Sequence, residues 1–247
     1  MDEGGFSEDD LRQIRDEGRA EAEVRRQWET FRRGVRPLTL DRPCRVGDGI
    51  ETVAAGEIPS LTALYDAAMD AGRIAVFVPA SGAATRMFRD WFRVLEDGDF
   101  ASHAAGDTFA RELPEYAFYP DLLAVLERRG TDVETLLRER DYAAILEAIL
   151  TSRGLNYGRL PKALLKFHID AEGGRTALEE HLAEAALYAG DNEGVCRVHF
   201  TVSEEHLPAV RDHLRTIQPR CEVRLGLRFQ VTLSTQNPAT HTLAVDL

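Results

Sequence analysis

Lysine and cysteine are both scarce in this sequence. Of the 30 basic residues among 247, 28 are arginine, and the two lysines, Lys162 and Lys166, lie four positions apart. The three cysteines, Cys44, Cys196 and Cys221, are odd in number and far apart, so they match no zinc-ligand spacing and no disulfide framework. The sequence therefore predicts neither a structural zinc site nor a disulfide-stabilised domain. A reducing cytoplasm is the expected compartment.

Long apolar runs and an excess of positive charge are also missing. Because no run of about eighteen apolar residues occurs, we expect no membrane-spanning segment, and the acidic start MDEGGFSEDD does not resemble a signal peptide. The net charge of −12 argues against nucleic acid as the main partner, since nucleic-acid binding depends on clustered cations. A small basic pocket for a nucleotide is still compatible with this charge. The oligomeric state is left open.

Residues 1–72 are predicted to form an N-terminal helical extension followed by a connection. Residues 7–33 are rich in charge and indicate one helix, with Ser7 as its N-cap. Residues 34–59 carry glycine and proline at intervals, which is typical of an irregular connection. A second helix is predicted over 60–71.

Residues 73–247 are predicted to form an α/β domain. The apolar run Ile74–Val78 indicates a buried strand in the centre of a sheet, and further strands are expected over 195–203 and within 221–236. Helical patterns between these strands predict a mostly parallel, Rossmann-like sheet with helices on both faces. A helical insert is expected at about 112–153.

Several helix boundaries within this domain can be predicted from caps and periodicity. A helix is expected over 87–96, and the second part of the helical insert is expected to begin with Thr131 as its cap. An amphipathic helix is predicted to contain RTALEEHL and to end at Gly190, and another is predicted over 204–217.

A loop of small residues, Ala80–Arg86, follows the first predicted strand. A strand, a small-residue loop and a helix form the layout of a phosphate-binding unit, although the spacing is neither that of a P-loop nor that of the dinucleotide fingerprint. Arg86 would oppose the dipole of the following helix, which suggests that it has another role, such as contacting phosphate. Lys162 supplies a compact ammonium that fits where a guanidinium does not. Ser81 and Gly82 could instead simply form a tight turn.

The histidines and the second lysine give weaker signals. Lys166 and His168 flank Phe167 in a predicted short strand, so they are expected to support a site indirectly or to be purely structural. His206 and His213 lie seven positions apart on one predicted helix without a third ligand, and we interpret both as surface residues. No metal ligands are assigned.

The loop resembles the G-G-x-G-T-R-M loop of the sugar-1-phosphate nucleotidyltransferases, the nucleotide-sugar pyrophosphorylases. The similar run here consists of Ala80, Ser81, Gly82, Ala83, Ala84, Thr85, Arg86 and Met87. Pro161–Leu164 is similar to the P-K-x-L motif of that family, in which the lysine meets the phosphates, and Gln236 looks like the glutamine that reads the base. The resemblance implies a nucleotide-diphospho-sugar transferase-like fold, with Arg86 and Lys162 acting on the reacting phosphates. It also implies a nucleoside triphosphate and a sugar phosphate as ligands, and Mg²⁺ as cofactor.

Three departures from that family stand out. Ala84 replaces the glycine before Thr-Arg, which limits how closely the backbone can approach a ligand. The sequence between Arg86 and Lys162, 75 residues long, contains the helical insert. The sequence stops just past Asp246 without a later strand that could end in a metal-binding aspartate, so we expect a C-terminally truncated fragment whose main Mg²⁺ ligand lies outside it.

The order of motifs also resembles an uncharacterised bacterial family known as a domain of unknown function. The motifs VPASGAATRMF, PKALLKFH and RTALEEHL carry this resemblance, which runs from about residue 40 to the last residue. The leading hypothesis is a protein similar to the nucleotidyltransferases that releases pyrophosphate. The alternatives are a non-catalytic nucleotide- or phosphosugar-binding module, and an oligomerising scaffold that binds partners through residues 7–33 and 112–153.

Overall fold

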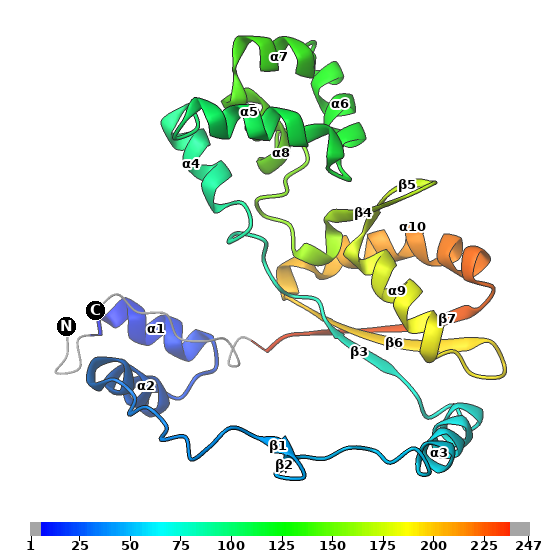
Figure 1. Cartoon of the computed structure of the whole chain (residues 1–247). Helices are drawn as coiled ribbons and strands as arrows, with labels where there is room; N and C mark the ends of the chain where they lie inside the picture. The colour runs from blue at the N-terminus through cyan, green and yellow to red at the C-terminus, as the bar shows by residue number, and fades with distance from the viewer. Residues whose placement is uncertain (1–5, 238–247) are drawn as a thin grey trace. The chain divides into compact units, whose positions relative to one another are not determined.

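The computed structural model describes residues 6–237 of the chain (Figure 1). These residues divide into two compact units, one that runs up to Tyr65 and also includes Gln236 and Asn237, and one that spans Asp66–Thr235. Within residues 6–237, no helix combines the length and the apolar character that crossing a membrane requires.

The helices and strands are numbered in chain order. The α-helices are α1 (Glu8–Asp16), α2 (Glu21–Arg33), α3 (Ile58–Asp70), α4 (Arg89–Asp97), α5 (His103–Glu112), α6 (Tyr119–Arg128), α7 (Val133–Glu139), α8 (Tyr142–Leu150), α9 (Ala177–Tyr188) and α10 (Leu207–Leu225). The short 3-10 helices are η1 (Leu113–Glu115), η2 (Lys162–Leu164) and η3 (Glu204–His206). The strands are β1 (Arg45–Val46), β2 (Gly49–Ile50), β3 (Val76–Pro79), β4 (Lys166–Asp170), β5 (Gly173–Thr176), β6 (Val195–Val202) and β7 (Arg228–Thr235).

In the first unit, two helices replace the single helix predicted over 7–33. Ser7 caps α1 as predicted: its backbone N–H donates to the Asp10 carboxylate at 2.7 Å, and its hydroxyl accepts from the Asp10 N–H. The prediction of one continuous helix was wrong, because Gly18 adopts a φ of +70° between α1 and α2. A left-handed residue at this point ends the helix, and glycine adopts that conformation without steric cost.

The second unit contains a parallel sheet with the strand order β3-β6-β7. Both strand pairs are parallel, as the sequence predicted. The prediction that the first strand is central was wrong, because β3 lies at the edge of these three strands and β6 lies in the middle. From Cys196 to Val202, buried and half-buried residues alternate strictly along β6. The buried ones point to the side of α9 and α10. Strand order follows from long-range pairing, which an apolar run of four or five residues does not encode.

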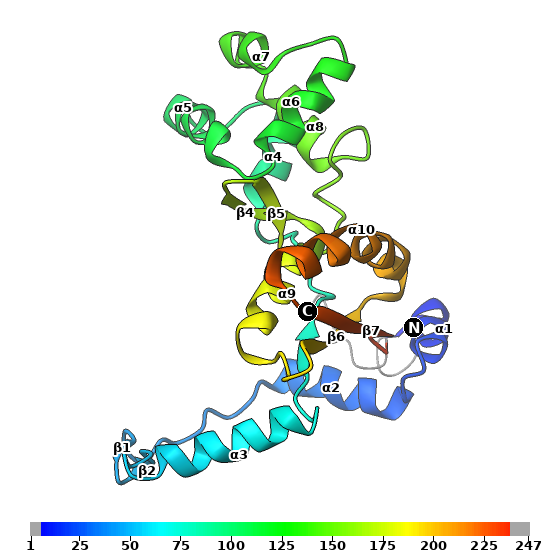
Figure 2. The same ribbon diagram turned by 90° about the vertical axis from the view of Figure 1, so that its right-hand side faces the viewer.

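Helices α9 and α10 cover the same face of this sheet (Figures 1 and 2). The shared hydrophobic cluster includes Leu182 on α9, Leu214 on α10, and Val198 and Phe200 on β6. Helices on both faces of the sheet were predicted. This prediction was wrong for α9 and α10, the helices that precede β6 and β7, because both lie on one face. The reason is that both crossovers add a strand in the same direction, so right-handed connections place both helices on one side.

Several element boundaries also differ from those predicted. Helix α10 continues to Leu225, so Cys221 belongs to the helix and not to a strand. Gly226 ends the helix with a φ of +71°, and β7 follows. Gly173–Thr176 form β5, which pairs antiparallel with β4, so the helix that contains ALEEHL begins only after this threonine.

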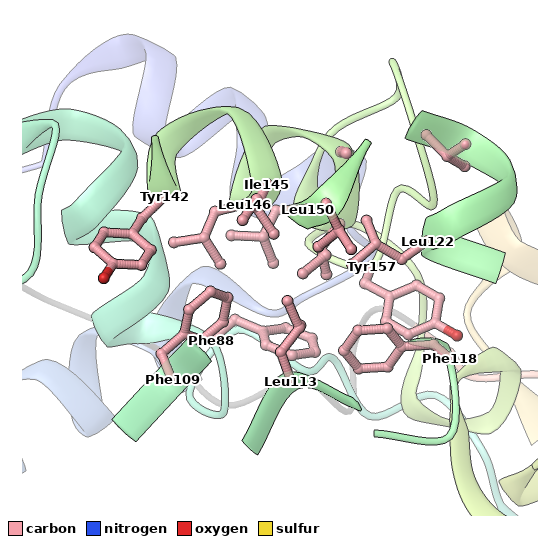
Figure 3. Packing of buried hydrophobic residues seen from close by; sticks show 14 of the residues in the cluster. Phe88, Phe109, Leu113, Phe118, Leu122, Tyr142, Ile145, Leu146, Leu150 and Tyr157 are labelled. Carbon is pink, nitrogen blue, oxygen red and sulfur yellow. The ribbon is translucent and has the colours of Figure 1, made fainter. Parts of the chain in front are cut away.

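A helical cluster is formed by α4 to α8 and the segments between them (Figure 3). It begins with α4, before the predicted insert at 112–153. The cap of α7 is Asp132, whose carboxylate accepts from the Thr135 N–H at 2.8 Å, so the prediction of Thr131 was wrong by one residue. The core of the helical cluster is apolar and rich in aromatic rings. The residues labelled in Figure 3 are Phe88, Phe109, Leu113, Phe118, Leu122, Tyr142, Ile145, Leu146, Leu150 and Tyr157.

Candidate functional site

The small-residue loop begins at the carboxyl end of β3 and joins the two hydrophobic clusters of the second unit. The Ala80 N–H donates to the Thr201 carbonyl at 2.7 Å, which extends the sheet by one residue. Ala80 is buried in the cluster around the sheet, whereas Ala84 is buried in the helical cluster. Both alanine side chains thus anchor the loop, and at these two positions only the backbone can meet a ligand.

The segment that contains Lys162 lies directly beside this loop. Ala83 and Pro161 form an isolated antiparallel bridge, and the Lys162 N–H donates to the Gly82 carbonyl at 2.9 Å. The loop leads into the helical cluster and the Lys162 segment leads back out of it, so the two passages of the chain meet. The structure therefore brings the two predicted phosphate motifs together at backbone level across 75 intervening residues.

Gly82 has no packing reason to be glycine in the part of the chain that the structure describes. Its φ lies outside the left-handed region, and no described atom lies within 4 Å of the position that a Cβ would take. At Gly174, by contrast, a Cβ would collide with the Ala117 carbonyl oxygen. The space beside Gly82 is therefore open, and both the tight turn and the close approach of a ligand stay predictions.

The loop also presents backbone donors that are not paired within the part of the chain that the structure describes. Among residues 6–237, no hydrogen-bond acceptor faces the backbone N–H groups of Gly82, Ala83, Thr85 and Arg86, and all four residues are exposed. Successive free N–H groups in a loop after a strand form a concave surface that suits an anion.

The two lysines of the chain lie in different electrostatic surroundings. The Lys166 ammonium lies 2.6 Å from the Asp121 carboxylate. Lys162 and Arg86 are both exposed, and neither forms an ion pair within the described residues. Lys166 is thus paired with a carboxylate, whereas Lys162 has no ion-pair partner among the described residues. Whether Lys166 supports a site indirectly stays a prediction. That the charged ends of Arg86 and Lys162 converge stays a prediction.

The remaining predicted site residues lie around the loop or outside it. Ser81 is half-buried and Thr85 is exposed, while His168 points outward from β4. Gln236 directly follows β7 and belongs to the first unit, so its role as a base-reading residue stays a prediction. Asp246 lies outside the described residues.

His213 was misjudged from the sequence, because it is not a surface residue. Its ring is half-buried, and Nε2 lies 2.9 Å from the Thr176 hydroxyl. Thr176 caps α9 in a capping box with Glu179, whose carboxylate accepts from the Thr176 N–H at 2.8 Å. Burial lowers the pKa of His213. The T-x-x-E spacing marks the box in the sequence, but no local pattern marks the histidine on another helix.

The described residues do not form a metal centre by themselves. Within residues 6–237, no group of three or more His, Cys, Asp or Glu side chains is placed to hold a metal ion. Because Mg²⁺ is usually held by one or two carboxylates together with substrate phosphates, Mg²⁺ as a cofactor stays a prediction. A surface cavity of about 570 Å³ lies between α4 and α5, lined in part by Asp90, Asp97 and Asp99, and it includes no residue of the loop.

These observations define a mixed α/β protein with a small-residue loop at the carboxyl end of a parallel strand and a lysine segment paired with that loop. Residues 7–247 match the family model described as Domain of unknown function (DUF4301), so the chain belongs to this family. This confirms the resemblance to an uncharacterised family. Neither the curated proteins nor the solved structures provided a match to the chain.

Proposed function

We propose that this chain binds a nucleoside triphosphate with its phosphates on the loop Ala80–Arg86 and on Lys162, in a Rossmann-like domain related to the sugar-phosphate nucleotidyltransferases. The observation that carries the proposal is the backbone pairing of Gly82 with Lys162 at 2.9 Å. It joins the two segments that resemble the phosphate motifs of that family. In open α/β sheets, ligands bind beyond the carboxyl ends of the strands, which is where this loop lies.

The chemistry of the loop supports an anionic ligand. The free N–H groups of the loop would donate to phosphate oxygens, and the glycine at position 82 would let the ligand approach the backbone. Lys162 would add a point charge that no carboxylate among the described residues neutralises. Arg86, at the other end of the loop, would contact the outer phosphates.

With a sugar phosphate as second substrate, such a site would support nucleotidyl transfer. A phosphate oxygen of the sugar phosphate attacks the α-phosphorus, a new P–O bond forms, and the bond from the α-phosphorus to the bridging oxygen of the β-phosphate breaks. Pyrophosphate then leaves with the bonding electron pair. The chain would contribute by positioning the two phosphates and by stabilising the charge that develops on the leaving group.

A non-catalytic nucleotide- or phosphosugar-binding module is the second candidate. It is favoured by the donor set, since the described residues form no protein-held metal site. It is also favoured by Ala84, whose side chain is buried and serves packing. Both candidates share the phosphate site and differ only in turnover.

The test is a series of lysine variants measured by calorimetric titration with nucleoside triphosphates and by pyrophosphate release. Lys162→Ala and Lys162→Arg should both weaken nucleotide binding, because a forked guanidinium does not replace an ammonium in a tight site. If the protein is catalytic, turnover should fall by roughly 10²–10³, or about 3–4 kcal/mol. Thermal melting should change little, since exposed substitutions usually stay within about 0.5 kcal/mol.

Lys166→Arg is the matched control. It keeps a cation opposite Asp121, so nucleotide binding should stay close to that of the unmodified protein. Pyrophosphate release separates the enzyme from the binding module. Normal nucleotide binding by Lys162→Ala would exclude the proposed phosphate contact, and an unmodified protein that binds no nucleotide would exclude both candidates.

A further inference from the structure

The face of the parallel sheet opposite α9 and α10 is polar. Parallel sheets are normally buried on both faces, and their strands are then apolar throughout. On this face, β6 presents Arg197, His199 and Thr201, and β7 presents Thr232 and Ser234. Arg197 is neutralised by Asp191 at 2.6 Å. The part of the face nearest the carboxyl ends of the strands is thus rich in hydroxyl groups and carries no carboxylate.

Four of these side chains form one hydrogen-bonded row. The two ring nitrogens of His199 lie 2.7 Å from the Thr232 hydroxyl and 2.8 Å from the Ser234 hydroxyl. The Ser234 hydroxyl also lies 2.9 Å from that of Thr201. The row holds the imidazole in one orientation, and it places three hydroxyl groups side by side, each able both to donate and to accept.

An exposed aromatic ring lies next to this row. Phe77 on β3 is 64% exposed, and its ring stacks on His199 with 5.6 Å between centroids and 10° between planes. Apart from this stacking, Phe77 belongs to neither hydrophobic cluster of the second unit. It does provide a flat apolar surface beside hydrogen-bonding groups, as ligand sites do.

The row and the ring occupy the last positions of the sheet before the loop. In register, Phe77 lies beside His199, and Pro79 lies beside Thr201, which in turn lies beside Ser234. The loop begins at the next residue of β3, where the Ala80 N–H donates to Thr201. A ligand whose phosphate lies on the loop can therefore reach this face, because the row and Phe77 lie level with the last three residues of β3 before the loop.

We infer that the hydroxyl row and Phe77 bind the sugar ring of a sugar phosphate whose phosphate lies on the loop. The inference rests on the proposed function and names where its second substrate is recognised. A sugar ring carries hydroxyl groups that match the paired donors and acceptors of the row. It also has an apolar C–H face that can lie on an aromatic ring. The row consists of three hydroxyl groups and one imidazole, which can exchange hydrogen bonds with a neutral sugar, while Arg86 and Lys162 lie at the loop for the phosphate.

The test compares sugar phosphates with inorganic phosphate. Binding of hexose and N-acetylhexosamine 1-phosphates, of inorganic phosphate and of nucleoside triphosphates is measured by calorimetric titration. The unmodified protein should bind at least one sugar 1-phosphate about tenfold more tightly than inorganic phosphate, a factor that one or two good contacts supply. Phe77→Ala and Ser234→Ala should each remove most of this preference and leave inorganic phosphate and nucleotide binding unchanged.

Controls separate the inference from the proposed function. Val223→Ala removes an apolar side chain from α10 that is even more exposed than Phe77, at 87%, and should change no affinity. Lys162→Ala should weaken the binding of all phosphate compounds together. If both sheet variants keep the preference, or if the unmodified protein prefers no sugar phosphate, the inference is wrong while nucleotide binding at the loop still stands. If no nucleotide binds, the proposed function and the inference fall together.

Discussion

The helical cluster and the sheet cluster of the second unit are built on different plans. The helical cluster is built around aromatic contacts, in which Trp91 packs edge-on against Phe109, Tyr116 and Phe118. The sheet cluster lies between the sheet and the helices α9 and α10, on one face of the sheet only. The opposite face of the sheet is the polar face that contains His199. We therefore expect the helical cluster to contribute mainly to stability, whereas the proposed ligand site lies at the sheet and its loop.

The two lysines repeat this contrast on a smaller scale. Lys166 is paired with Asp121, which lies on α6 of the helical cluster, and it links that cluster to β4. Lys162 lies beside the loop without a partner among the described residues. The two lysines of an arginine-rich chain thus differ in their surroundings, and only Lys162 is proposed to contact a ligand.

The comparison would break first if the helical cluster were loosely packed. Ile149 has no exposed surface and lies within α8, so Ile149→Ala should cost about 2–5 kcal/mol of unfolding free energy through the lost contacts and the cavity left behind. Urea denaturation measures this cost. Leu187→Ala on α9, where 84% of the residue is exposed, is the control and should stay within about 0.5 kcal/mol. A cost below about 1 kcal/mol at Ile149 would contradict a closed core.

A smaller difference in unfolding free energy should separate variants of two helix caps, one in each cluster. Thr176 is buried and shares its hydroxyl between the cap of α9 and His213, so Thr176→Ala should cost toward the upper end of about 0.5–2 kcal/mol. Ser102 caps α5 of the helical cluster with a single exposed bond of 3.2 Å, so Ser102→Ala should cost toward the lower end. Chemical denaturation of both variants measures the difference, and equal costs would show that burial of the cap has no influence.

The smallest expected effect is a pH dependence of stability that arises at His213. Burial lowers the folded pKa of this group, so between its ordinary value near 6.5 and the lower folded value the unfolded chain binds the extra proton. Stability should be full above about pH 6.5 and should fall as the pH is lowered toward the folded pKa. Among its neighbours, Glu179 opposes the downward shift and Lys166 adds to it.

The measurement is urea denaturation at several pH values between 8 and 5, for His213→Gln and for His168→Gln. His213→Gln should flatten part of the fall, whereas His168→Gln, which alters an exposed histidine on β4, should leave it unchanged. Identical profiles for the two variants would show that His213 does not titrate differently in the folded state.

The sequence by itself determined the features that depend on a few neighbouring residues. The Ser7 cap, the apolar strand that ends in the small-residue loop, the long alternating strand β6, and the parallel character of the sheet were all predictable. The cap and the strands follow from capping and side-chain alternation, which act over one to four positions along the chain. The parallel sheet follows from the order of strand and helix patterns along the chain. The segment that contains Lys162 was likewise conspicuous from composition alone.

Only the tertiary structure decided which of these features lie together. The edge position of β3, the shared face of α9 and α10, the pairing of Gly82 with Lys162 and the contact of His213 with Thr176 join residues far apart in the chain. The physical reason is that these arrangements depend on strand pairing and on the burial of whole surfaces. Both sum many weak contacts over the folded chain, so no short run of residues carries their signature.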